Sequence, residues 1–215
     1  MNRKNTTMIL WLLLVGALMA ACSNGAAVVG VEQSGEGAVG PQRIENATEV
    51  LKFDPASIAT GGDPVAGTCR ELAGVPGAYQ CDLESDVAGP CFALGGTRLI
   101  CGPNPVANTY DVLVSPTGDL PPVSPPSPDR AVPFFVELAT GMTCAYRVAP
   151  EPVIIGGILA QYECDEPYNY LLGEGSPSFS QDAPLWEAGL YTLDPATGTS
   201  PSGKVPVDIL RVWIP

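Results

Sequence analysis

The residues most able to do chemistry in this 215-residue chain are its seven cysteines. They are Cys22, Cys69, Cys81, Cys91, Cys101, Cys144 and Cys164. The chain contains no histidine, which excludes Ser-His-Asp or Cys-His catalysis and any metal site that needs imidazole. Cysteines without histidine partners point to disulfide bonds or to covalent modification.

The start of the chain explains why the number of cysteines is odd. Two basic residues precede an apolar run, residues 8–21, which is shorter than the roughly 20 residues that a comfortable membrane span needs. Ala20 and Ala21 then lead into Cys22, which resembles a bacterial lipobox. We therefore predict a lipoprotein signal peptide over residues 1–21 and a lipid anchor on Cys22. An ordinary cleaved signal and an uncleaved anchor are the alternatives.

Six cysteines remain if Cys22 is lipidated, and outside the cytoplasm an even number predicts disulfide bonds. A three-residue turn, Gly95 to Thr97, would place Cys91 opposite Cys101, whereas a two-residue turn would place it opposite Ile100. We predict three pairs: Cys69–Cys81, Cys91–Cys101 and Cys144–Cys164. Pairing of Cys69 with Cys101 and of Cys81 with Cys91 is the main alternative.

Two groups of acidic residues could bind a cation or hydrolyse a glycoside. The first group is Asp82, Glu84 and Asp86, and the second is Glu163, Asp165, Glu166 and Glu174. Neither has the spaced ligands of a calcium loop, so we predict solvated acidic surfaces with no metal and no cofactor. A secreted hydrolase that uses carboxylates in place of histidine is the alternative function.

Aromatic residues gather in the second half of the chain. Exposed rings can stack on sugars or anchor a protein partner, whereas buried rings only fill a β core. The candidates for a recognition surface are Tyr162, Tyr168, Tyr170 and Trp186.

The charge of the chain limits its partners. The formal net charge is −13, and the signal stretch holds Arg3 and Lys4, so the rest of the chain is still more acidic. Such a surface repels nucleic acid, and we predict no nucleic-acid partner.

The pattern of apolar and turn-forming residues after the first 50 residues predicts an all-β fold. Short apolar runs there alternate with glycine and proline, of which the whole chain holds 24 and 23, and we find no amphipathic helix of normal length after the signal. The final segment alternates at Val205, Val207 and Ile209 and then shifts by one residue, which predicts a β-bulge.

We expect small disulfide-stapled β subdomains that follow a signal peptide and a flexible tether. The predicted parts are the lipidated cysteine with its tether (22–50), a four-cysteine β unit (51–119), a Pro-rich spacer (120–130) and a two-cysteine β unit (131–215). A short internal repeat, which we call the internal echo, would relate the two units, because Thr-Cys is followed by Tyr-x-Cys-Asp in each. In the first unit these are Thr68-Cys69 and Tyr79-Gln80-Cys81-Asp82; in the second they are Thr143-Cys144 and Tyr162-Glu163-Cys164-Asp165.

The cysteine surroundings resemble a family of extracytoplasmic modules of bacterial lipoproteins and membrane-bound proteins, some of them fused to serine/threonine kinases. The resemblance is carried by Gly67-Thr68-Cys69, Ala78-Tyr79-Gln80-Cys81, Pro90-Cys91-Phe92 and Ile100-Cys101-Gly102-Pro103-Asn104-Pro105. It implies a stapled extracytoplasmic module and implies no reaction.

The sequence therefore predicts a membrane-anchored lipoprotein on the extracytoplasmic side of a cell membrane. We expect a binding or structural module of the cell envelope and no enzyme. Its expected partners are the membrane, through the lipid, and an envelope protein or glycan.

Overall fold

The computed structural model describes residues 47–125, 132–172, 179–181, 183–200 and 202–215. Its architecture is all-β, as predicted, and consists of two small barrels. The signal stretch, Cys22 and residues 23–46 of the predicted tether lie outside the described residues. No helix among the described residues is long and apolar enough to cross a membrane.

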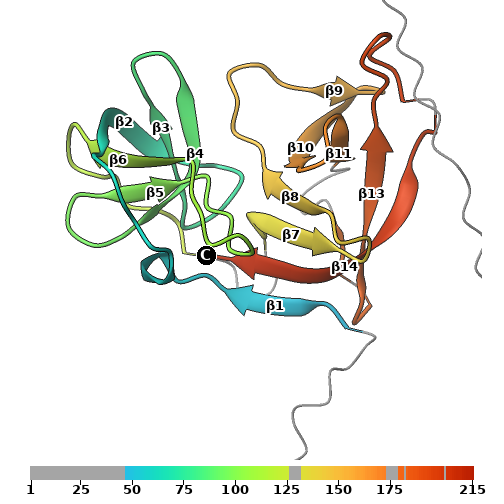
Figure 1. Cartoon of the computed structure of the whole chain (residues 1–215), viewed down its shortest axis with the longest axis horizontal. Coiled ribbons are helices and arrows are strands. Elements are labelled where there is room, and N and C mark those ends of the chain that lie inside the picture. The colour runs from blue at the N-terminus through green and yellow to red at the C-terminus, as the bar shows by residue number, and fades with distance from the viewer. Residues whose placement is uncertain (1–46, 126–131, 173–178, 182, 201) are drawn as a thin grey trace, which may run out of the picture. The chain divides into compact units, whose positions relative to one another are not determined.

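The first barrel has five strands and appears in blue-green to green in Figure 1. Its strands are β2 (Val65–Glu71), β3 (Tyr79–Asp82), β4 (Val87–Ala93), β5 (Leu99–Cys101) and β6 (Val112–Pro116). Consecutive strands pair in antiparallel fashion, and β6 closes the barrel by pairing with β2 in parallel. The parallel closure follows from the odd number of strands, because strand direction alternates along the chain.

The second barrel has six strands, coloured yellow to red in Figure 1. They are β7 (Phe135–Leu138), β8 (Thr143–Tyr146), β10 (Ile158–Cys164), β11 (Asn169–Leu172), β13 (Trp186–Thr192) and β14 (Val205–Ile214). The even number lets β14 pair in antiparallel fashion with both β13 and β7. The register between β14 and β7 shifts between Ile209 and Arg211, which confirms the predicted bulge.

Four short elements lie outside the two closed barrels: β1 (Glu49–Lys52), the 3-10 turn η1 (Pro55–Ser57), β9 (Ile154–Ile155) and β12 (Phe179–Ser180). Strand β9 extends β10 as a small hairpin, and β12 pairs with β13. Strand β1 pairs in parallel with β14. Residues at the boundary between the predicted tether and the first unit therefore join the sheet of the second barrel.

The three disulfides pair as predicted, each between directly opposite residues of neighbouring strands. The bonds are Cys69–Cys81 between β2 and β3, Cys91–Cys101 between β4 and β5, and Cys144–Cys164 between β8 and β10. The Leu94 amide donates to the Arg98 carbonyl at 3.0 Å, so the turn between β4 and β5 has the predicted three-residue loop. The alternative pairing of Cys69 with Cys101 is excluded.

A shared hydrophobic cluster joins the two barrels. Phe53 follows β1, Phe92 lies on β4 and Phe134 precedes β7, and their ring centroids are 4.6 to 5.2 Å apart. These rings belong to one buried cluster that also holds Ile100 of the first barrel and Trp213 of the second. Aromatic contacts of this kind add to the stabilisation from burial. The barrels therefore form one packed unit across this cluster.

Candidate functional site

A cavity of about 320 Å³ lies where the two barrels meet, and we call it the inter-barrel groove. This volume is at the lower end of the range for ligand-binding sites in proteins. The first barrel contributes Gly89, Pro90, Gly102, Pro103, Asn104 and Asp111 to its lining. The second contributes Phe134, Phe135, Ala145, Tyr146, Arg147, Val148, Ala149 and Glu163.

Arg147 supplies the positive charge in the groove wall, just after the end of β8. Its side chain is only 18% exposed, and its Nε donates to Oε2 of Glu163 at 3.2 Å. Its Nη1 donates to the carbonyl of Glu151 at 2.6 Å. Strands β8 and β10 are adjacent, so the sheet itself places this guanidinium beside Glu163. The charge of Arg147 is thus balanced from within its own barrel.

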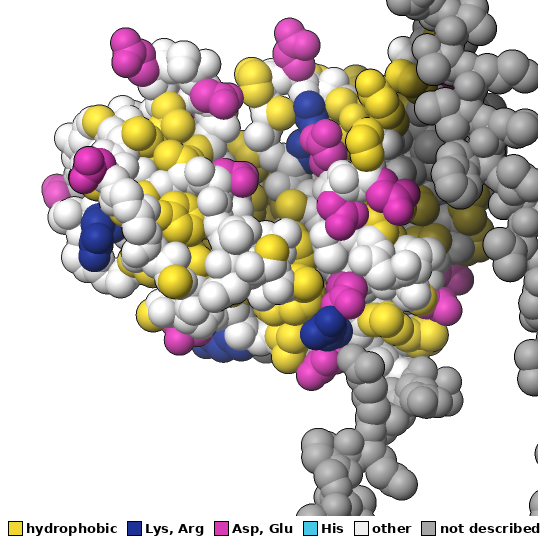
Figure 2. Space-filling view, viewed as in Figure 1, with side chains coloured by type: hydrophobic (Ala, Val, Ile, Leu, Met, Phe, Trp, Pro, Cys, Tyr) yellow, Lys and Arg dark blue, Asp and Glu magenta, His cyan; other side chains and the backbone are white. Residues whose placement is uncertain are grey.

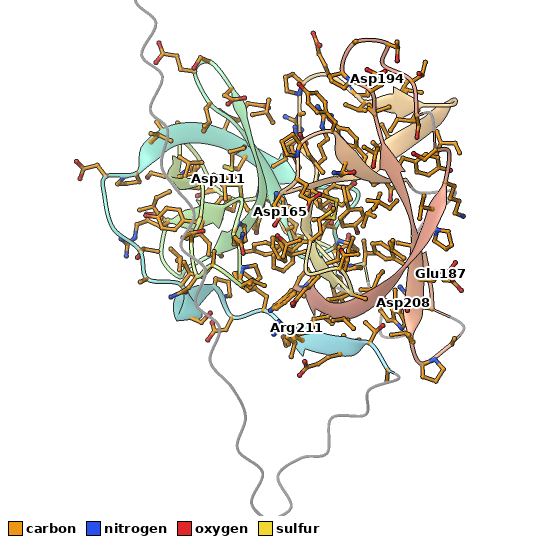
Figure 3. The ribbon with its side chains drawn as sticks, turned by 45° about the vertical axis from the view of Figure 1, so that its right-hand side comes forward. Asp111, Asp165, Glu187, Asp194, Asp208 and Arg211 are labelled. Carbon is orange, nitrogen blue, oxygen red and sulfur yellow. A yellow bond between two sulfur atoms is a disulfide. The ribbon has the colours of Figure 1, made fainter. Side chains whose placement is uncertain are left out.

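Asp111 lies on the opposite wall, just before β6, and Figure 3 labels it among the strands of the first barrel. Its carboxylate packs over Gly102, where an added Cβ would lie 2.0 Å from Oδ2. Gly102 has a φ of +62°, so this position favours glycine on both grounds. Asp111 is exposed by surface area, but the neighbouring groove walls partly bury its carboxylate, and this partial burial raises its pKa. No hydrogen bond or ion pair within the described part of the chain compensates this carboxylate.

The groove is lined by both polar and apolar groups, and the described residues form no metal centre in it. The only cluster of described residues with metal-like spacing is formed by the sulfurs of Cys81, Cys91 and Cys101, within 4.8 Å of one another. All three are in disulfides, and a thiolate is the form of cysteine that binds metal.

The four aromatic candidates do not form one exposed surface. Tyr162 is 1% exposed, and its hydroxyl donates to the carbonyl of Pro133, so this residue belongs to the core and not to a recognition surface. Tyr170 is buried, and Trp186 is half-buried against the core of the second barrel. Tyr168 is 49% exposed and has a φ of +64°, a backbone conformation that is rare for a bulky residue.

The predicted acidic groups are divided between structural roles and the groove. Asp165 accepts hydrogen bonds from the amide and the hydroxyl of Thr143, so it ties β8 to the end of β10. Asp82 forms an ion pair with Arg70 at the surface. Glu163 lines the groove, and Glu174 lies outside the described residues.

Sequence reasoning missed Asp111 and Arg147. Arg147 stands out only as one of ten basic residues, and Asp111 has no distinguishing spacing. Their shared role in the groove follows only from the packing of the two barrels against each other. Comparison of the chain with protein-family models, with curated proteins and with solved structures finds no match.

Proposed function

We propose that this protein is a lipid-anchored extracytoplasmic binding module that recognises its partner in the inter-barrel groove. The observation that carries the proposal is the groove, with Arg147 and Asp111 on opposite walls. The signal stretch that ends at Cys22 supports the location, as does the resemblance to extracytoplasmic modules. The three disulfides agree with an oxidising compartment.

Binding is favoured over hydrolysis because two of the acids considered for catalysis already have partners. Asp165 is bound by Thr143, and Glu163 is bound by Arg147. A carboxylate hydrolase needs one acid and one base that face the same bond. We therefore propose an envelope protein or glycan as the partner and no catalytic step.

The location is tested by metabolic labelling with palmitate in the native host. We expect label in the wild type and none in Cys22→Ala, with release of the variant from the membrane fraction. An unlabelled wild type, or a variant that keeps the label, rules out the lipid anchor at Cys22.

The groove is tested by capture from envelope extract with the full detergent-solubilised chain. Ala149 lines the groove, so Ala149→Trp should fill it, whereas Ala196→Trp adds the same ring at an exposed turn. We expect a partner that binds the wild type and Ala196→Trp but is lost with Ala149→Trp. A partner retained equally by all three proteins, or by none, contradicts the groove as the binding site.

A further inference from the structure

We infer that the inter-barrel groove takes an extended polypeptide segment whose lysine or arginine side chain pairs with Asp111. The inference rests on the proposed function, because it names the ligand class of the same groove.

The first step is the balance of charge in the groove. Arg147 is already held by Glu163 and by the Glu151 carbonyl. Asp111 has no cationic partner among the described residues, so the free charge of the groove is negative. Asp111 is exposed to solvent in the free protein, so a ligand that covers its carboxylate removes water from it, and a cation on that ligand would offset the cost.

The second step concerns the whole surface. The chain carries 23 acidic and 10 basic residues, and acidic side chains are spread over the face seen in Figure 2, where basic ones are few. Long-range attraction therefore favours a cationic ligand over an anionic one.

The third step is an exposed apolar pair at the start of β10, the strand whose residue Glu163 lines the groove. Leu159 of β10 and Ile154 of β9 are directly opposite each other, and they are 48% and 61% exposed. Leu159 and Glu163 alternate with the buried residues Ala160, Tyr162 and Cys164, so they share the outward face of β10. Four residues of strand separate them, which is about 13 Å.

The spacing favours a polypeptide over a small amine. If an extended segment lies along β10 with a basic side chain in the groove beside Glu163, the side chain four residues away lies over the pair Ile154 and Leu159. A small amine would fill the groove and leave this apolar pair in water. Extended peptides are commonly recognised through separate contacts to alternate side chains, which is what the groove and the apolar pair would provide.

The test uses a random heptapeptide library displayed on phage and panned against the full chain in detergent. We expect enrichment of lysine or arginine, with an aliphatic residue four positions away. The best peptide should bind Asp111→Asn at least about tenfold more weakly than the wild type in fluorescence anisotropy. Asp208→Asn is the matched control, because Asp208 does not line the groove and lies well apart from Asp111 in Figure 3, and it should bind as the wild type does.

The outcomes separate this inference from the proposed function. Selection without basic residues, no selection at all, or equal binding by Asp111→Asn overturns the peptide inference. Full displacement of the peptide by n-butylammonium with equal affinity would also overturn it, in favour of a simple amine. If Ala149→Trp still abolishes capture of a partner from extract, the binding function stands while the proposed ligand class is wrong. If neither test depends on the groove, both proposals fail.

Discussion

At the scale of single residues, the two halves of the chain use the same tyrosine contact. Tyr79 and Tyr162 each stand two residues before a cysteine that bonds to the neighbouring strand. The Tyr79 hydroxyl donates to the Pro121 carbonyl at 3.2 Å, and that of Tyr162 donates to Pro133 at 2.6 Å. The internal echo in the sequence thus corresponds to one recurring structural contact, made to Pro121 within the Pro-rich spacer and to Pro133 just after it.

Replacement of Tyr162 by phenylalanine should lower the free energy of unfolding by about 1 kcal/mol. The variant keeps the ring contacts with Tyr146 and Phe179 and loses only the buried hydrogen bond to Pro133. Urea denaturation measures the difference. Tyr168→Phe removes an exposed hydroxyl and should change stability little; an equal loss in both variants would contradict the assigned role.

Asp111→Asn should make the ligand-free protein more stable than the wild type at neutral pH, with a difference that disappears in acid. Burial raises the pKa of Asp111, so the folded state holds this proton more tightly than the unfolded chain does. Wild-type stability therefore falls as pH rises from the unfolded pKa, about 3.9, through the raised folded pKa. The amide removes this loss, and urea midpoints measured across that interval give the difference. A difference that grows on acidification would contradict the prediction.

The sequence predicted residue pairs well and missed the groove, for physical reasons. The cysteine pairs depend on short turns and on strand register. Residues close in the sequence determine both, as in the turn between Cys91 and Cys101. Asp111 acquires its surroundings from Gly102 and from the approach of the second barrel. Burial of Tyr162 likewise depends on which face of β10 turns inward, and aromatic composition alone carries no information on that choice.

At the scale of elements, each barrel is a meander whose strand number fixes how it closes. The last strand was predicted together with its bulge, because alternation of apolar residues reports directly on the two faces of a strand. The parallel pairing of β1 with β14 was missed, because four residues contain too little pattern to show which strand they join.

One strand pair in the second barrel has an unfavourable charge arrangement. Glu187 of β13 lies directly opposite Asp208 of β14, both are exposed, and Figure 3 shows them at the same part of the barrel. Like charges in this position are destabilising. Glu187→Lys should therefore raise the free energy of unfolding by roughly 0.5 kcal/mol, as measured in urea at low salt.

The control for that change is Asp119→Lys, which alters net charge equally at an exposed loop position. It should stabilise less than Glu187→Lys, and added salt should reduce the gain from Glu187→Lys. Equal effects of the two substitutions would mean that total charge, and not the strand pair, is responsible.

At the scale of the whole molecule, the barrels depend on close approach as well as on the phenylalanine cluster. A Cβ at Gly74 of the first barrel would lie 1.7 Å from the hydroxyl of Tyr146 in the second. Glycine at this position therefore lets the ring of Tyr146 pack against the backbone at residue 74. This contact and the shared cluster bring the walls of the groove together.

Gly74→Ala should cost about 1 to 3 kcal/mol of stability, because the added methyl group forces Tyr146 to move. In the Tyr146→Leu background the same substitution should cost much less, and the difference is the coupling energy of a double-mutant cycle in urea. Gly118→Ala is the control, since a Cβ there meets nothing within 4 Å. Equal costs of Gly74→Ala in both backgrounds would contradict this contact.

The pairing of β1 with β14 also has a mechanical meaning. Any pull transmitted along the residues before Thr48 reaches the second barrel at Thr48, whose hydroxyl donates to the Ile209 carbonyl, and then at β1, which is held by four residue pairs to β14. Further backbone hydrogen bonds flank them, from Thr48 to Pro184 and from Phe53 to Ile214. A force along the strand loads these bonds together, whereas a force across it opens them in turn. This short strand therefore sets how much tension the protein can bear before Phe53 is drawn out of the cluster that joins its two barrels.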